Sequence, residues 1–359
     1  MASLSAAPAA VDDEPRLPVT ILTGYLGAGK TTLLNRILSE DHGRRYAVIV
    51  NEFGEIGIDG DLVASADLGT REELFEMNNG CICCTVRGDL IRTLHGLLGK
   101  AGGGGKFDAI IIETTGLADP GPVLQTFFVD PFLAARTFLD SVTTLVDAKH
   151  VLLRLEDSRE AVAQIAFADQ IVVNKSELVG EDELRAIAAR LNELNPLASI
   201  HLARRADVAL ERILGRGAFD LARTLELVPA DDHVHDEHCG HRHQPVAQPA
   251  EDRRPRHDES ILSVSLRAMK PLDGPRFDAW ISDLVATRGA DILRAKGIID
   301  VAGEVRRLVV QSVHMLLEGD YQRPWQALER RSSRLVLIGR HLDQAALQAD
   351  FDACAAAEV

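Results

Sequence analysis

The sequence lacks a long hydrophobic run and an excess of basic residues, and each absence excludes a class of protein. No apolar stretch approaches the roughly 18 to 20 residues that a membrane-spanning helix needs. The net charge is −15, which argues against nucleic acid or an anionic membrane as the main partner, because both carry negative charge. We therefore expect no nucleic-acid partner and no membrane partner.

Cysteine is scarce as well, with five in 359 residues, and three of the five lie together at Cys81, Cys83 and Cys84. This spacing suits a metal or redox site in a reducing compartment and not a disulfide framework. The first 17 residues have no basic segment of the kind that begins a signal peptide. We expect a cytoplasmic protein in which residues 1–17 form a disordered lead-in.

A complete phosphate-binding loop, G-x-x-x-x-G-K-T, follows the apolar run Val19–Leu22 and precedes a helical pattern over Thr32–Leu38. The strand–loop–helix setting is the context that makes this motif specific. Glycines let backbone N–H groups surround a polyphosphate, the lysine reaches the β- and γ-phosphates, and the threonine hydroxyl ligates Mg²⁺. The predicted nucleotide contacts are Gly24, Gly27, Gly29, Lys30, Thr31 and Thr32, with Lys30 also catalytic.

Two carboxylates follow buried strands that would lie near this loop. Glu113 ends the apolar run Ala109–Ile112 and is predicted to orient Mg²⁺ together with Thr31, while the Gly116 N–H is predicted to lie nearest the γ-phosphate. Glu52 follows the strand Ala47–Val50, where a first switch segment would sense the γ-phosphate. We expect Glu52 and Glu113 to be catalytic.

The base-recognition segment is predicted at Asn174, Lys175 and Glu177, directly after the run Ile171–Val173. Guanine-selective enzymes carry Asn-Lys-x-Asp at this place, and a carboxylate there can accept from the N1–H and N2 amino groups of guanine. Glu177 is one methylene longer than the aspartate. Because adenine lacks these donors, GTP is favoured over ATP. An ATP-using small-molecule kinase is the less favoured alternative.

The cluster Cys81, Cys83 and Cys84 is predicted to bind a soft or borderline metal, above all Zn²⁺. Three protein ligands leave a fourth position open, which fits a metal that is passed on. A pair of buried core cysteines and a redox thiol site remain alternatives.

The alternation of strand-like and helical runs over residues 18–228 predicts a P-loop α/β domain with a mostly parallel, doubly wound sheet. Residues 229–259 read as a polar linker, residues 260–345 as a smaller α+β domain, and residues 346–359 as a C-terminal helix and tail. Arg307–Met315 is one of the strands expected in the second domain. His314 and Trp325 are interpreted as core or interface residues and not as ligands.

A histidine tract lies in the linker. Imidazole is a common ligand of Zn²⁺, Ni²⁺ and Co²⁺, so the tract is interpreted as an auxiliary metal store, with a solvated low-complexity linker as the alternative. Its histidines are His233, His235, His238, His241 and His243.

Taken together, these motifs resemble the CobW-type GTPases, a family of metal-handling P-loop proteins, and within it the zinc-handling metallochaperones. The resemblance rests on Gly24–Thr32, Asn51–Gly54, Cys81–Cys84, Glu113–Gly116 and Asn174–Glu177, in that order. It continues through Leu117–Gly121 and through Val313-His314-Met315 with Trp325.

The resemblance implies a GTPase that uses GTP and Mg²⁺ and delivers Zn²⁺, or Co²⁺ in some members, to a client metalloprotein. GTP and Mg²⁺ are expected to order the segments around Glu52 and Glu113, which flank the cysteines, so that hydrolysis releases the metal. A nucleotide- or metal-dependent dimer is a further expectation. The alternative is an assembly or activator protein, of the cobalamin or nitrile hydratase type, in which zinc is only structural.

Overall fold

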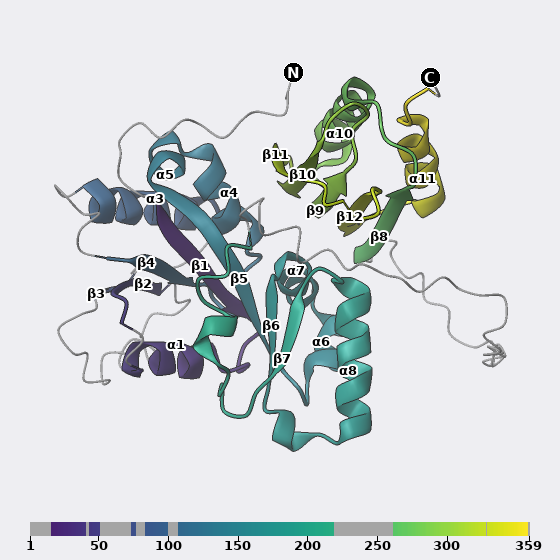
Figure 1. The fold of residues 1–359 in the computed structure, drawn as a ribbon. Coiled ribbons are helices and arrows are strands. Elements are labelled where there is room, and N and C mark those ends of the chain that lie inside the picture. The colour runs from purple at the N-terminus through teal and green to yellow at the C-terminus, as the bar shows by residue number, and fades with distance from the viewer. Residues whose placement is uncertain are drawn as a thin grey trace.

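The computed structural model of the 359-residue chain describes residues 16–40, 43–50, 73–76, 83–99, 107–218, 261–327 and 329–357. They form two sheets, each with its own helices (Figure 1). The first sheet carries the P-loop, and the second belongs to the C-terminal part of the chain.

The first sheet has seven strands, and every described pairing in it is parallel. Its central strands are apolar and buried on both faces, as parallel sheets covered by helices require. In spatial order the strands are β3 (Glu73–Glu76), β2 (Tyr46–Val50), β4 (Ala109–Glu113), β1 (Leu17–Gly24), β5 (Thr137–Asp147), β6 (Gln170–Asn174) and β7 (Ser199–Leu202).

Alternate residues of a strand point to opposite faces of the sheet, and both faces are apolar here, so helices cover both of them. Ile110 and Ile112 pack with the helices α3, α4, α5 and α7, whereas Ala109 and Ile111 pack with α1 and the segment around η3. The α-helices of this domain are α1 (Lys30–Ser39), α3 (Cys83–Gly99), α4 (Gly121–Val129), α5 (Pro131–Arg136), α6 (Val151–Asp157), α7 (Arg159–Phe167) and α8 (Glu181–Leu194). The short helices η2 (Ser176–Leu178) and η3 (Leu210–Arg212) follow β6 and β7.

The second sheet has five antiparallel strands, with α10 (Gly274–Arg288) and α11 (Gln344–Ala353) packed on one face. Along β12, Leu335 and Leu337 pack with these helices, whereas Val336 and Ile338 join the core of the first domain. The sheet is therefore buried on both sides. In spatial order its strands are β11 (Leu316–Pro324), β10 (Arg306–Val313), β9 (Ile292–Ile299), β12 (Ser333–Arg340) and β8 (Ile261–Ala268).

The second domain lies against α4, α7 and α8 of the first (Figure 1). A buried charge cluster stands at this contact. Asp169, directly before β6, accepts from Arg294 and from Lys296 Nζ at 3.0 Å, and both cations come from β9. All three side chains are at most 2% exposed. Burial disfavours the Asp169 carboxylate, but the two cations outweigh burial and hold its pKa below the usual range.

The predicted fold class is confirmed: a parallel P-loop sheet with helices and a smaller α+β domain. The expected strand Arg307–Met315 runs two residues past the end of β10, because β10 ends at Val313 and His314 has φ +51°, a turn conformation. Among the described helices, none combines the length and the apolar character needed to cross a membrane.

Candidate nucleotide and metal site

The predicted nucleotide contacts lie at the carboxyl ends of β1, β4 and β6, at one edge of the parallel sheet. Register explains this placement, since Leu22 of β1 pairs with Glu113 of β4. Gly24 therefore leaves β1 beside the carboxylate that ends β4. Ligands of open α/β sheets bind at this edge, in the crevice beyond the strand ends.

The P-loop runs from Gly24 to the first turn of α1, and its glycines are required by its path. Gly24 has φ +138°, and a Cβ there would collide with the Leu145 backbone. Gly29 has φ +106°, and a Cβ there would collide with the Asn174 side chain. Lys30 Nζ donates to Gly24 O at 2.8 Å, which holds the ammonium over the loop. This geometry fits a polyphosphate surrounded by backbone N–H groups at a helix N-terminus.

The Mg²⁺ ligands that the sequence predicts lie at the same edge. Thr31 is in the first turn of α1, and Glu113 is only 6% exposed at the end of β4. The next residue joins the two strands, because Thr114 Oγ1 donates to Thr23 Oγ1 at 2.8 Å and Thr114 N donates to Leu22 O at 2.9 Å. A buried carboxylate and a hydroxyl beside a P-loop are the donor set that holds Mg²⁺ in such sites.

Gly116 lies in close contact with the P-loop. A Cβ on Gly116 would stand 2.7 Å from Leu26 N, so only glycine allows this approach of two backbone segments. The predicted γ-phosphate contact therefore lies directly beside the loop that is predicted to hold the phosphates.

The base-recognition segment connects three parts of the chain. Asn174 is 2% exposed, donates through Nδ2 to Ala28 O at 2.9 Å, and accepts at Oδ1 from Ala206 N at 2.7 Å. Lys175 has φ +57° and donates to Asp147 Oδ2 at 2.8 Å. Glu177 lies in η2 and is exposed. Asn174 thus supports the P-loop, while Glu177 stands free of the core at the edge where a base would lie.

Sequence reasoning missed two site residues, Asp147 and Gln164. Asp147 ends β5 at the same edge, and its position after the buried run Ser141–Val146 was a signal that could have identified it. Gln164 is 1% exposed on α7 and donates through Nε2 to Gly116 O at 3.1 Å and to Ala118 O at 3.0 Å. No spacing in the sequence indicates that contact, because it joins segments far apart in the chain.

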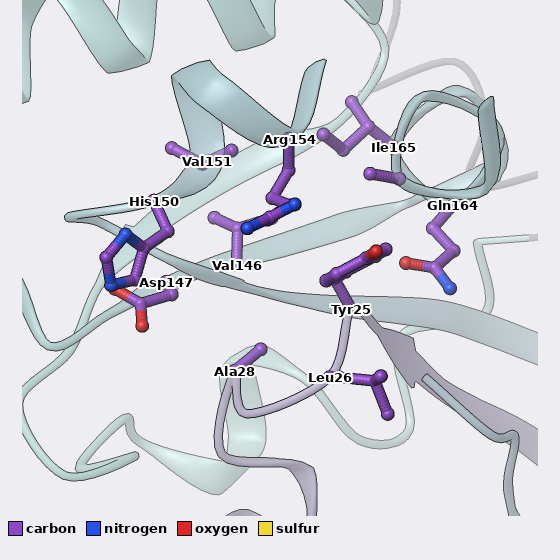
Figure 2. Close-up of a pocket in the computed structure, with 11 residues that line it drawn as sticks. Tyr25, Leu26, Ala28, Val146, Asp147, His150, Val151, Arg154, Gln164 and Ile165 are labelled. Atoms are coloured by element: carbon purple, nitrogen blue, oxygen red, sulfur yellow. The ribbon is translucent and has the colours of Figure 1, made fainter. Parts of the chain in front are cut away.

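A cavity of about 280 Å³ opens beside the P-loop, between it and the helices α6 and α7 (Figure 2). Tyr25 and Leu26 contribute from the P-loop, Arg154 from α6, and Gln164 from α7, with Asp147 at the end of β5. The Arg154 guanidinium lies 5.4 Å from the centre of the Tyr25 ring. The cavity contacts the flank of the P-loop, and Gly24, Gly27, Gly29 and Lys30 do not line it.

The second domain also reaches the segment after Glu113. His314, in the turn between β10 and β11, packs against Phe167 with ring centres 5.2 Å apart and the rings tilted by 53°. Its ring is so close to Gly121 that a Cβ there would stand 2.7 Å from Nε2. Burial lowers the pKa of His314 below its ordinary value, against the attraction of Asp119. Trp325 lies beside Arg307 and Arg331, with guanidinium-to-ring distances of 5.0 and 5.7 Å.

Part of the predicted metal chemistry lies outside the described residues. Cys81, Glu52 and the tract His233, His235, His238, His241 and His243 belong to that part, and Cys83 and Cys84 are described only as the first two residues of α3. Within the described ranges, no group of three or more His, Cys, Asp or Glu side chains is placed to hold a metal ion.

The fold and this edge define a P-loop nucleotide-binding protein with an added C-terminal domain. Residues 18–202 match the family described as CobW/HypB/UreG, nucleotide-binding domain, and residues 261–355 match the cobalamin synthesis protein cobW C-terminal domain. The chain belongs to this CobW family, which confirms the resemblance stated from its motifs.

Curated relatives and a solved structure cover nearly the whole chain. It is 34% identical over 336 residues to the zinc chaperone YjiA of Escherichia coli (strain K12), across 93% of this chain and 98% of the relative. It is 35% identical over 360 residues to the zinc chaperone CobW of Pseudomonas aeruginosa, across 92% and 90% of the two chains. The crystal structure of Zn(II)-bound YjiA GTPase from E. coli superposes with a TM-score of 0.72 at 31% identity, covering 95% and 100%.

Proposed function

We propose that this protein is a GTP-hydrolysing zinc metallochaperone that binds Zn²⁺ through Cys81, Cys83 and Cys84 and transfers it to a client metalloprotein in a nucleotide-dependent way. Relatives named zinc chaperones, one of which has a Zn(II)-bound GTPase structure, support the GTPase activity and the use of zinc. GTP, Mg²⁺ and the cargo Zn²⁺ are the implied ligands. A cytoplasmic location, with a client whose identity is open, completes the proposal.

The contact between α3 and α4 is the observation that carries the coupling. The segment after Glu113 leads directly into α4, and α4 packs against α3, the helix that begins with Cys83 and Cys84. His95 of α3 reinforces the contact, since its Nε2 lies 3.1 Å from Asp130, the residue that caps the end of α4 and the start of α5. A nucleotide that moves the Glu113 segment therefore acts on a helix that starts within the cysteine motif.

In the same proposal, Lys30 stabilises the charge that develops on the transferred phosphoryl group, and Glu113 and Thr31 hold Mg²⁺. Gly116 donates its N–H to the γ-phosphate. Glu177 accepts from the guanine edge, and Asn174 and Lys175 orient the loop that carries it. The residues Gly24, Gly27, Gly29 and Thr32 complete the phosphate contacts, Glu52 belongs to the first switch segment, and a nucleotide- or metal-dependent dimer remains part of the proposal.

The test is a Zn²⁺ titration of the protein loaded with a non-hydrolysable GTP analogue, with GDP, or without nucleotide. We expect affinities that differ about tenfold or more between the two nucleotides, equivalent to about 1.4 kcal/mol. Cys83→Ser should abolish this difference. Cys354→Ser is the matched control, because Cys354 is a buried thiol in the second domain.

Zinc bound elsewhere must be separated from zinc on the cysteines. A Zn(II)-bound structure exists for a YjiA variant in which one glutamate and two cysteines were changed to alanine. The titration is therefore repeated with the five tract histidines replaced by alanine. The proposal fails if the tight site persists without Cys81, Cys83 and Cys84, or if its affinity is the same in every nucleotide state.

A second function, GTP-dependent activation of a metalloenzyme with a structural zinc, is favoured by two relatives named as zinc-regulated GTPase metalloprotein activators. Over 51% of this chain and 45% of the relative, it is 42% identical to zinc-regulated GTPase metalloprotein activator 1 of Schizosaccharomyces pombe. Zinc exchange separates the two functions. A chaperone releases labelled Zn²⁺ within single GTP turnovers, whereas a structural site retains it through many cycles.

A further inference from the structure

The buried amide of Gln164 is bonded to the segment that follows Glu113. Its Nε2 lies 3.1 Å from Gly116 O and 3.0 Å from Ala118 O. A side-chain amide nitrogen has two hydrogens, so these two bonds use both of them. The Gln164 side chain is 1% exposed, so its amide is largely shielded from bulk water. One residue on α7 therefore fixes the turn Gly116–Ala118.

The P-loop contacts the same turn. A Cβ on Gly116 would stand 2.7 Å from Leu26 N, so the two backbones are already in close contact. Figure 2 shows Gln164 on α7 and Leu26 on the P-loop at the same cavity. The turn is thus in contact both with Gln164 and with the loop predicted to hold the phosphates.

Helix α7 is itself anchored, which makes Gln164 a fixed support. Thr144 Oγ1 of β5 donates to Gln164 O at 2.8 Å. Asn195 Nδ2 donates to Ile165 O at 2.7 Å and to Ala168 O at 2.8 Å. At the end of the helix, Arg294 of the second domain donates to Phe167 O. The sheet, α8 and the second domain therefore all fix the position of the amide.

We propose that Gln164 is a positioning residue for GTP hydrolysis, which holds the Gly116–Ala118 turn so that the Gly116 N–H meets the γ-phosphate. This inference rests on the γ-phosphate contact in the proposed function. It has a specific consequence, because GDP has no γ-phosphate. Loss of the Gln164 hydrogen bonds weakens binding of a GTP analogue and slows hydrolysis, while GDP affinity stays unchanged.

Two variants test this role. Gln164→Met keeps the length of the side chain and removes both donors. Gln164→Glu puts a carboxylate against two carbonyl oxygens, and only its protonated form can donate a hydrogen bond. We expect kcat for GTP to fall about 100-fold in both variants at pH 8, equivalent to about 2.7 kcal/mol for two lost hydrogen bonds. GDP affinity should stay within about twofold of wild type.

The pH profile distinguishes positioning from a structural role. Lowering the pH from 8 to 6 should recover about tenfold of kcat in Gln164→Glu, relative to wild type and to Gln164→Met over the same range. Comparison with wild type and Gln164→Met removes the pH effects of the other titratable groups at the cavity, namely Tyr25, Asp147, His150 and Arg154. Gln344→Glu, an exposed position on α11, is the matched control and should behave as wild type.

A milder variant covers the case in which the Gln164 variants do not fold. Thr144→Val removes the hydroxyl that holds Gln164 O, and we expect about a threefold fall in kcat with GDP affinity unchanged. Equal loss of GDP and GTP-analogue affinity, or a lower melting temperature with unchanged kcat in the folded protein, would overturn the positioning role. If wild type itself shows no GTP hydrolysis, it is the proposed function that fails.

Discussion

At the scale of single residues, Asn174 connects separate segments of the chain at the nucleotide edge. Its amide joins the P-loop carbonyl of Ala28 to the backbone N–H of Ala206, and it ends the strand that leads to Glu177. The side chain is 2% exposed, so each bond is made away from water. One side chain thus holds the phosphate loop and the base-recognition segment in register.

We expect Asn174→Ala to weaken GTP and GDP alike, by about tenfold or more, because the phosphate loop and the base-recognition segment serve both nucleotides. It should also lower the free energy of unfolding by about 1 to 3 kcal/mol, since Ala28 O and Ala206 N lose a buried partner. Fluorescent-nucleotide titration and urea unfolding measure the two effects. Asn192→Ala, exposed on α8, is the control, and equal effects in both variants would contradict this role.

Local motifs account for the site residues that the sequence predicted, whereas a long-range contact explains why Gln164 was missed. Lys30, Glu113 and Asn174 each stand at a fixed offset from a buried strand, so a single chain segment reveals them. Gln164 lies mid-helix on α7 and reaches Gly116 and Ala118 only through the packing of that helix on the sheet. No local pattern encodes such a contact, because both partners are backbone carbonyls of a distant segment.

At the scale of elements, β9 shows why one strand of the second domain escaped the sequence analysis. Its sequence ILRAKGII contains Arg294 and Lys296, which a local pattern assigns to a solvated face. Every residue of β9 is buried. The strand is stable there because Asp169, remote in the chain, supplies the countercharge, and Lys296 Nζ also donates to Ala218 O at 2.7 Å.

Lys296 gives β9 a pH-dependent contribution to stability. Burial lowers its pKa from 10.5 to about 8, against the attraction of Asp169. Between those two values the folded protein binds fewer protons than the unfolded chain, so the contribution of Lys296 to the free energy of unfolding rises with pH from about 8 upward.

Urea unfolding at pH 7, 8, 9 and 10 tests this sign. The stability of wild type minus that of Lys296→Met should increase across the series. Lys270→Met, at an exposed position after β8, is the control for loss of a surface lysine. A wild-type advantage that declines above pH 8 would show that the ammonium form is the one favoured by folding.

At the scale of the whole molecule, the two domains share a hydrophobic core. Val313, Val336 and Ile338 of the second sheet belong to the same cluster as Leu124 and Phe167 of the first domain. Asp169 with Arg294 and Lys296 is buried at the same contact. The second domain, which contacts Gly121 through His314, is therefore also fixed to the end of α7. A movement of the segment after Glu113 would act on contacts made by both domains.

Asp169→Asn removes the carboxylate that accepts hydrogen bonds from Arg294 and Lys296. The two buried cations then lose this countercharge, and we expect the free energy of unfolding to fall by about 3 to 5 kcal/mol, as measured by urea denaturation. The control is Asp207→Asn, whose side chain is 80% exposed in its ion pair with Arg36 and should change stability by about 0.5 kcal/mol or less.

Adding Lys296→Met to Asp169→Asn decides between charge and packing as the cause. If uncompensated charge dominates, the double variant is more stable than Asp169→Asn alone, because one of two buried cations has been removed. If packing dominates, the two losses add, since Met cannot restore the bond to Ala218 O. The first outcome would show that the buried cations are stable at the domain contact only while the Asp169 carboxylate is present.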